Sequence, residues 1–290
     1  MSVANWFEVF NQNLRMSTST VDDITYRYKR ITKQLNKDFY NSFSDTYRSF
    51  YVGSYGRGTD ILVSDIDMIF QMPYSEYVKY NSYSGNGQSS LLQAVKTSIE
   101  KTYTSSIKAD GQVIVIKFSD GIIFELVPAF INVDNSFTFP DTNNGGSWKT
   151  TNPKPEIAEM TSKNILWNRN LMRLCRMARA WKYKWDVPMG GLLIDTLAYN
   201  FMKNCSYKEK SYLYYDYISR DFFKFLSEQN SSQNYWLSPG ANQYVWRKGS
   251  FEYKAKQCYN IALEAIEKEK NYPYTAKSKW REIYGTNFPS

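Results

Sequence analysis

The hydrophobic pattern changes its period along this chain, and that change limits the folds that the chain can adopt. Up to about residue 130, several short β-prone runs are bounded by glycine or proline, as strands are. From Ile165 onward, apolar residues recur at three and four positions over long segments, as in amphipathic helices. The sequence therefore predicts an α/β lobe followed by a helical lobe. A chain of 290 residues is long enough to give both lobes a core.

The same patterns predict the individual elements. The first 47 residues indicate one long packing helix, in which Ile24, Tyr28 and Ile31 share a face. Residues 132–156 are rich in Asn, Gly and Pro and indicate a long connection between the lobes. In the first lobe we expect a helix at 91–101 and strands at 50–52, 65–70, 112–118 and 121–127. In the second we expect helices at 164–185, 192–203, 212–228 and 250–270.

Composition excludes several kinds of chemistry. The sequence contains no histidine, so Ser-His-Asp and Cys-His catalysis and histidine-bound metals are excluded. The net charge of +8 favours an anionic partner such as a nucleotide. Because no apolar run approaches about 18 residues and no signal peptide is recognisable, we expect a cytoplasmic protein without a membrane span. Cys175, Cys205 and Cys258 form no metal or redox motif and are expected to be buried thiols.

Three acidic residues in predicted strands point to a metal site. Asp65 and Asp67 are two residues apart, so their carboxylates leave the same face of a strand and lie close together. Such a pair is costly unless a cation neutralises it, and carboxylates suit magnesium. Glu125 is an isolated acid in the apolar run 122–128. If the two strands are neighbours, the three acids can hold two magnesium ions, with manganese as a substitute, for phosphoryl transfer.

A glycine-rich turn, GSYGRGT at residues 53–59, precedes the acid pair. Its glycines allow the backbone N–H groups to approach a polyphosphate, and Ser54 offers a hydroxyl to a phosphate oxygen. The spacing matches neither a Walker A loop nor a dinucleotide fingerprint. Each motif is weak by itself, but the turn, the acid pair and the later acid together are consistent with one function.

These motifs resemble those of nucleotidyltransferases of the polymerase beta type. More closely, they are similar to those of the bacterial relatives of cyclic GMP-AMP synthase, the cGAS/DncV-like nucleotidyltransferases (CD-NTases), whose core is the SMODS domain. The similar segments are VGSYGRGTDILVSDIDMIF, NGQSSLLQAV, DGIIFELVPAF, GGSWKTTNPK and RMARAWK. The resemblance implies an α/β plus α fold: a polymerase beta-like catalytic lobe with a mixed β-sheet in residues 1–150, and a packed helical lobe in residues 151–290 that completes the nucleotide-binding cleft.

The resemblance also implies roles for particular residues. Asp65, Asp67 and Glu125 would be the metal ligands, although Glu125 replaces the Asp that is common at this place in the superfamily. Triphosphate contacts would come from Gly53 and Ser54 of the turn. Further contacts would come from a basic helix, where we expect Arg179 first and Lys182 second, with a solvated basic face as the alternative. Some relatives carry a base-stacking Ser-Tyr pair where this chain has Gly190 and Gly191, so no base-binding residue is assigned.

The implied activity is synthesis of a cyclic di- or trinucleotide from ribonucleoside triphosphates such as GTP and ATP, with release of pyrophosphate. Such enzymes usually act in antiphage defence, where an effector senses the product. We favour a guanine-containing cyclic dinucleotide such as cyclic di-GMP on overall resemblance alone. No zinc ribbon is present, so we expect no nucleic-acid activator, and we expect a monomer. The alternatives are nucleotide transfer to RNA, protein or a small molecule, and a non-catalytic nucleotide-binding module.

Overall fold

The computed structural model describes residues 2–62 and 65–290, which form two compact units. The α/β unit comprises Met16–Arg57 and Val63–Pro153, and the helical unit comprises Met1–Arg15, Gly58–Leu62 and Lys154–Ser290. The α/β plus α class is confirmed. The expected lobe boundary at residue 150 lies close to the observed one, but it misassigns the first 15 residues and the short segment 58–62, which both belong to the helical unit.

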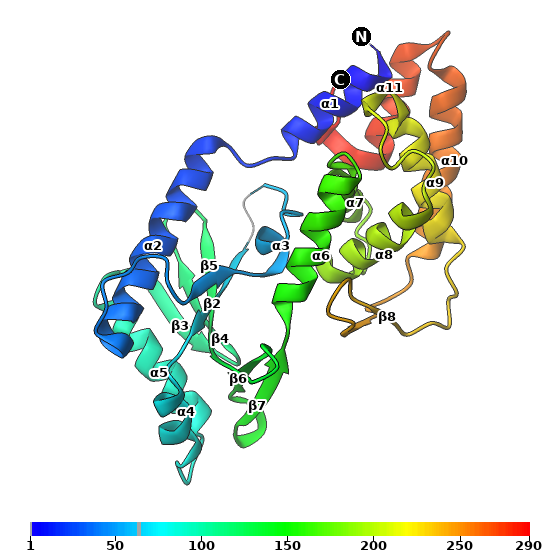
Figure 1. Ribbon diagram of the computed structural model, residues 1–290. Helices are drawn as coiled ribbons and strands as arrows, with labels where there is room; N and C mark the ends of the chain where they lie inside the picture. The colour runs from blue at the N-terminus through cyan, green and yellow to red at the C-terminus, as the bar shows by residue number, and fades with distance from the viewer. Residues whose placement is uncertain (1, 63–64) are drawn as a thin grey trace. The chain divides into compact units, whose positions relative to one another are not determined.

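A seven-stranded mixed sheet forms the centre of the α/β unit (Figure 1). Its strand order is β1-β2-β5-β4-β3, and β6 pairs with β5 while β7 pairs with β6. Strands β2 and β5 run parallel, and the other pairs of the sheet are antiparallel. The strands are β1 (Ser49–Tyr51), β2 (Asp65–Gln71), β3 (Ser106–Asp110), β4 (Val113–Lys117), β5 (Ile123–Ile131), β6 (Phe137–Asp141) and β7 (Ser147–Thr151).

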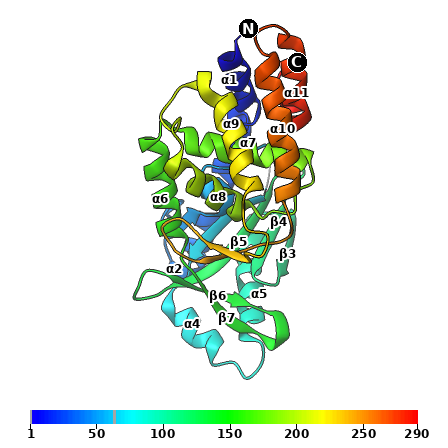
Figure 2. The same cartoon turned by 90° about the vertical axis from the view of Figure 1, so that its right-hand side faces the viewer.

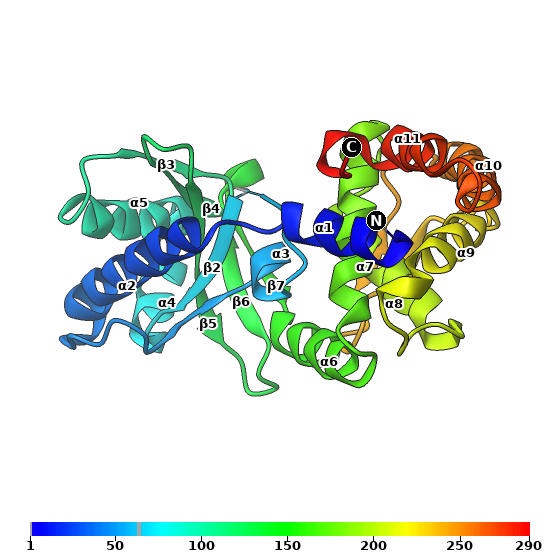
Figure 3. The ribbon, with the colours of Figure 1, turned by 90° about the horizontal axis from the view of Figure 1, so that it is seen from above.

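Helices cover one face of this sheet. Figure 3 shows α2 and α5 side by side against the strands, and the two helices bury their apolar faces in one core with the sheet. The side chains of Ile66, Phe124 and Leu126 are fully buried there because alternate residues of a strand point to the same face. The helices of this unit are α2 (Thr18–Tyr40), α3 (Gly53–Gly56), α4 (Tyr74–Asn81) and α5 (Gly87–Glu100).

The N-terminal region contains two helices where the sequence predicted one. Helix α1 (Val3–Asn13) ends before α2 begins at Thr18. Ser17 caps α2, since its hydroxyl accepts a hydrogen bond from the Thr20 N–H at 3.1 Å. Trp6 and Phe10 of α1 are buried in the core of the helical unit, whereas the apolar face of α2 belongs to the other core. The continuous helical pattern of the sequence did not reveal that Ser17 starts a new helix, or that the two helices belong to different cores.

The expected irregular connection at 132–156 is also wrong, because most of it is a β-hairpin. Strands β6 and β7 pair through residues 137–151, and helix α6 (Pro153–Leu166) follows directly. Asn144, Gly145 and Gly146 all have positive φ and form the turn. The Asn- and Gly-rich composition therefore marks a tight turn between two strands.

The helical unit is built around a large aromatic and aliphatic core. In Figure 2, α9, α10 and α11 lie beside one another, and they share this core with α1, α7 and α8. Positive φ angles at Asn168 and Arg169 interrupt the expected helix 164–185 between α6 and α7. The remaining elements are α7 (Asn170–Lys184), α8 (Gly191–Asn204), α9 (Tyr215–Ser227), α10 (Glu252–Lys268), α11 (Pro273–Tyr284) and the hairpin of β8 (Tyr235–Leu237) and β9 (Tyr244–Trp246).

Cys175, Cys205 and Cys258 are all free and buried, as predicted. Within the described part of the chain, no helix is both long enough and apolar enough to cross a membrane.

Candidate active site

The three predicted acids lie on the two parallel strands of the sheet. Strand β2 carries Asp65 and Asp67, strand β5 carries Glu125, and the register pairs Asp67 directly with Glu125. Their neighbours Ile66 and Phe124 are fully buried under α2 and α5. Because side chains alternate along a strand, the acids occupy the opposite face of the sheet. The two acid-bearing strands are therefore neighbours in the sheet, as the sequence predicted.

The electrostatics of this face favour a bound cation. Burial raises the pKa of Asp67, and Asp65 raises it further, while Arg57 opposes both effects. The pKa of Glu125 is raised by burial and then by the charges of Asp67, Asp65 and Asp110. Carboxyl groups with raised pKa values are held where their charged forms are unfavourable. A divalent cation would remove this cost.

The three acids suit a hard divalent cation, both because they are carboxylates and because their strands are adjacent. Carboxylate oxygens are the ligands that magnesium prefers, and adjacent parallel strands bring two of them together. Among the described residues, no group of three or more acids or cysteines is already arranged so that it could hold a metal ion. The side chains of the three acids would therefore have to turn toward a common point to bind one.

The glycine turn packs directly against Asp67 of the acid pair. Gly53 has a φ of +61°, and a Cβ atom at this position would overlap the Oδ2 atom of Asp67. The Val52 N–H donates a hydrogen bond to the Asp67 carbonyl at 2.9 Å. Residues 53–56 form the short helix α3, on which Ser54 is half-buried. Only glycine at position 53 lets this turn and the Asp67 carboxylate lie so close together.

Arg57 is a member of this site that the sequence did not single out. It follows α3 and is only 6% exposed. Its charge lowers the pKa of Asp67, so it partly compensates the burial of that carboxylate. The sequence signal that could have identified Arg57 is its position inside the predicted phosphate turn.

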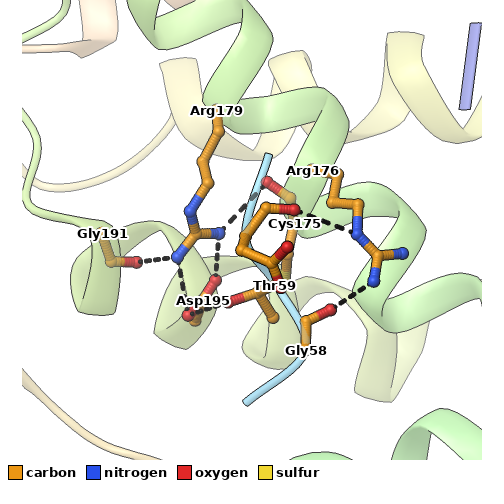
Figure 4. Close-up of polar contacts among 8 residues, drawn as sticks. Gly58, Thr59, Cys175, Arg176, Arg179, Gly191 and Asp195 are labelled. Carbon is orange, nitrogen blue, oxygen red and sulfur yellow. Dashed lines mark hydrogen bonds and ion pairs between the residues drawn. The ribbon is translucent and has the colours of Figure 1, made fainter. Parts of the chain in front are cut away.

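The basic helix of the sequence is α7, and it does not present Arg179 to solvent. Arg179 is 5% exposed, and its two terminal nitrogens pair with the carboxylate of Asp195 at 2.5 and 2.9 Å. It also donates to the Gly191 carbonyl at 3.1 Å (Figure 4). A guanidinium with these partners is already satisfied by the protein. The expected triphosphate contact of Arg179 stays a prediction.

Lys182 is half-buried on the same helix, and the charge of a second lysine, Lys248, acts on it. Burial lowers its pKa, and the charges of Lys248 and Arg179 lower it further. Lys248 follows β9, and its Cε atom lies 3.4 Å from the place where a Cβ of Gly190 would be. Among the described residues neither lysine forms an ion pair. The charge of Asp186 raises the pKa of Lys182, and a bound anion would act in the same direction. Lys248 was not predicted, because it is distant in sequence and lies in no motif.

The mixed sheet and the acids on its parallel strands β2 and β5 define a nucleotidyltransferase fold of the polymerase beta type. Within that class, the chain belongs to the family of the Second Messenger Oligonucleotide or Dinucleotide Synthetase domain (SMODS), whose family model matches residues 1–164. The predicted family resemblance is thereby confirmed.

Known relatives agree with this membership. A protein of Bacillus cereus (strain VD146) named probable cyclic nucleotide synthase is 22% identical over 178 residues, which are 58% of this chain and 52% of that protein. The match thus spans about half the length of that relative. The CdnC:HORMA-deltaN complex of E. coli MS115-1 contains a similar chain, with 14% identity, a TM-score of 0.71, and coverage of 99% of this chain and 98% of that one.

A second solved structure is the CD-NTase CdnG of Bradyrhizobium diazoefficiens in complex with GTP. It has 8% identity and a TM-score of 0.69, and the match covers 98% of this chain and 95% of that one. At such low identity, these two structures establish the shared fold.

Proposed function

We propose that this protein joins ribonucleoside triphosphates into a cyclic di- or trinucleotide and releases pyrophosphate. The observation that supports this activity best is the pairing of Asp67 with Glu125 on adjacent parallel strands, with Asp65 on the same face. Membership of the SMODS family supports the same activity. CdnG was solved with GTP, and we propose GTP and ATP as substrates here. A guanine-containing cyclic dinucleotide such as cyclic di-GMP is the product that we favour.

We further propose that Asp65, Asp67 and Glu125 hold two magnesium ions, which manganese can replace. When bound, such ions neutralise phosphate charge and acidify a ribose hydroxyl. In each transfer, the ribose oxygen forms a bond to the α-phosphate of a second nucleotide, the bond between the α- and β-phosphates breaks, and the hydroxyl proton is lost to solvent. Two such transfers close a dinucleotide ring. The protein contributes mainly position and charge to this reaction.

The residues that bind the triphosphate are assigned by charge and placement. Gly53 and Ser54 would meet it from the turn beside Asp67. Lys182 and Lys248 would bind phosphate oxygens, because their mutual repulsion is relieved by an anion. Arg179 would act only indirectly, through its ion pair with Asp195.

We propose that the protein acts in the cytoplasm as a monomer in antiphage defence and that an effector senses its product. No nucleic-acid activator is proposed. A large increase in rate with added duplex DNA would contradict this part of the proposal.

Product analysis tests the proposed activity. Purified protein is incubated with magnesium and all four ribonucleoside triphosphates, then treated with phosphatase and examined by mass spectrometry. A phosphatase-resistant cyclic nucleotide that disappears with a chelator, and in the Asp67→Asn variant, is the expected result. Linear products or transfer to added RNA would favour the tailing alternative. Nucleotide binding without any turnover would favour the non-catalytic module.

A further inference from the structure

The short segment Gly58–Leu62, called the linking segment below, belongs to the helical unit although its neighbours in sequence belong to the α/β unit. It follows the turn that contains Gly53 and Ser54, and it precedes Asp65 by a few residues. The chain thus joins this segment directly to the turn on its N-terminal side.

Arg176 of α7 holds the backbone of this segment. Its Nη2 atom donates to the carbonyl of Gly58 at 2.6 Å (Figure 4). Its Nε atom donates to the carbonyl of Asp60 at 3.2 Å. The charge of Arg176 also opposes the burial that raises the pKa of the Asp60 carboxyl. One guanidinium thus fixes two carbonyls of the segment, and its rigid fork makes that contact directional.

A buried carboxylate holds the same segment from a second side. The Thr59 hydroxyl donates to Oδ2 of Asp195 at 2.9 Å, and both side chains are completely buried. Arg179 in turn fixes both oxygens of Asp195, as Figure 4 shows. Ile61 packs into the core of the helical unit, and the Leu62 N–H donates to the Leu14 carbonyl at 3.2 Å.

The buried ion pair of Arg179 and Asp195 is not needed for stability alone. A buried ion pair is no better for stability than apolar side chains of similar volume, because both charges must leave water. It does, however, fix geometry. The Arg179–Asp195 pair places one carboxylate oxygen where a single hydroxyl of the segment can reach it. Gly58 adds a further constraint, since its φ of +65° is unfavourable for other residues.

We propose that Arg176 and Asp195 are positioning residues that hold the linking segment in one conformation and so keep the Gly53–Ser54 turn in place for nucleotide transfer. This inference rests on the proposed function for its catalytic consequence. Arg179 supports Asp195 in this role. The basic helix thus acts on the active site through the backbone of the linking segment.

The Thr59→Val variant tests the proposal, because it removes one hydroxyl and keeps the shape of the side chain. Tyr284→Phe is a matched control: it also removes one buried hydroxyl of the helical unit, which donates to Ser219 at 2.8 Å, far from the segment in sequence. We expect Thr59→Val to lower kcat by about 10- to 100-fold while KM stays nearly constant, as for a misplaced reacting group. Thr59→Ser, which keeps the hydroxyl, should recover most of the rate.

Hydrogen exchange of the full chain provides a readout that does not depend on turnover. In Thr59→Val and in Arg176→Gln, we expect faster exchange in residues 53–62 than in Tyr284→Phe. If both variants exchange and turn over like the control at equal melting temperature, the positioning role is wrong. If the wild-type protein makes no nucleotide product, the proposed function fails, whereas the exchange comparison still decides whether these residues hold the segment.

Discussion

Asp67 is the residue at which stability and the proposed function conflict most clearly. Its carboxylate is partly buried, has Asp65 on the same face, and lies so close to Gly53 that no side chain fits there. Burial and the charge of Asp65 both disfavour the ionised form, and Arg57 compensates only in part. A residue with a purely structural role would gain from being neutral.

Replacing Asp67 with Asn should therefore separate stability from activity. We expect the metal-free variant to gain about 0.5 to 1 kcal/mol in free energy of unfolding, because an unfavourable charge is removed. It should lose the increase in melting temperature that magnesium gives the wild type. Turnover should fall by at least about a hundredfold. Glu267→Gln, at an exposed acid on α10, should change neither property. A magnesium-induced gain retained by Asp67→Asn would rule out a metal at this residue.

Asp216 provides a prediction about pH. Burial raises its pKa from 3.8 to about 6, with Arg220 opposing and Asp221 adding to the shift. Burial raises the pKa of Glu269, and the charge of Asp216 raises it further, so Glu269 is coupled to Asp216. Between pH 4 and 6 the folded state binds a proton that the unfolded state has released. The free energy of unfolding should therefore fall as the pH rises through this range, by a total of about 3 kcal/mol.

Urea unfolding at pH 4.5, 6 and 7.5 measures this effect. Asp216→Asn should unfold at a higher urea concentration than the wild type at pH 7.5, and the difference should shrink at pH 4.5. An unchanged pH dependence in the variant would show that Asp216 is not the group responsible.

Lys182 and Lys248 can be compared with Lys184, which is exposed on the same helix α7. Alanine at either of the first two positions should raise KM for the donor triphosphate by about tenfold, because a phosphate contact is lost. The Lys184→Ala control should leave KM unchanged. If all three variants behave alike, the basic residues of this region act only through general attraction of anions. Initial rates of pyrophosphate release at varied nucleotide concentration provide the measurement.

At the scale of elements, the turn at α3 is shaped by a close approach as well as by its backbone angles. Gly53 and Gly121 both have positive φ, but a Cβ at Gly121 would meet nothing within 4 Å, whereas at Gly53 it would collide with Asp67. Gly121→Ala should thus cost about 1 kcal/mol from backbone strain alone. Gly53→Ala should cost more and should also displace the carboxylate.

Chemical denaturation and turnover of the two variants test this distinction. Gly121→Ala should keep its activity, and Gly53→Ala should lose most of it. Equal stability and equal turnover in both variants would mean that the turn at α3 adapts without moving Asp67.

Some elements of the fold could be predicted from the sequence, and others could not. Strands β2 and β5 were predictable because acids interrupt apolar runs, and their adjacency followed from the assumption that the acids share a site. The hairpin of β6 and β7 was missed because its turn residues dominate the local composition. The ion-pair partner of Arg179 could not be predicted either. Its partner Asp195 lies in an ordinary amphipathic helix, and only the folded packing of α7 and α8 brings the two charges together.

For the whole molecule, the central observation is that neither compact unit is one continuous piece of chain. The sequence boundary at residue 150 separates α1 from the helices with which it shares a core. Trp6, Phe7 and Phe10 are at most 2% exposed in that core. Burial of three large aromatic side chains is a major part of the stability of such a unit.

A fragment of residues 151–290 should therefore fail to fold into a native-like unit. We expect broad thermal unfolding and weak near-ultraviolet dichroism for this fragment. Adding a peptide of residues 1–15 should sharpen the transition. The same peptide with Phe7 and Phe10 replaced by Ala serves as the control. Cooperative unfolding of the fragment without any peptide would show that the core is complete without α1.

The placement of the chain's first and last elements has a practical consequence for spectroscopy. The side chain of Asn13 at the end of α1 donates to the carbonyl of Asn287 at 2.9 Å, and the rings of Phe7 and Phe288 are 5.2 Å apart. A donor and an acceptor dye attached near residues 2 and 290 would thus begin with high energy transfer. Their signal would follow the opening of the helical unit, while a change confined to the sheet of the α/β unit would leave it unaltered. Such a labelled protein would report on one unit alone.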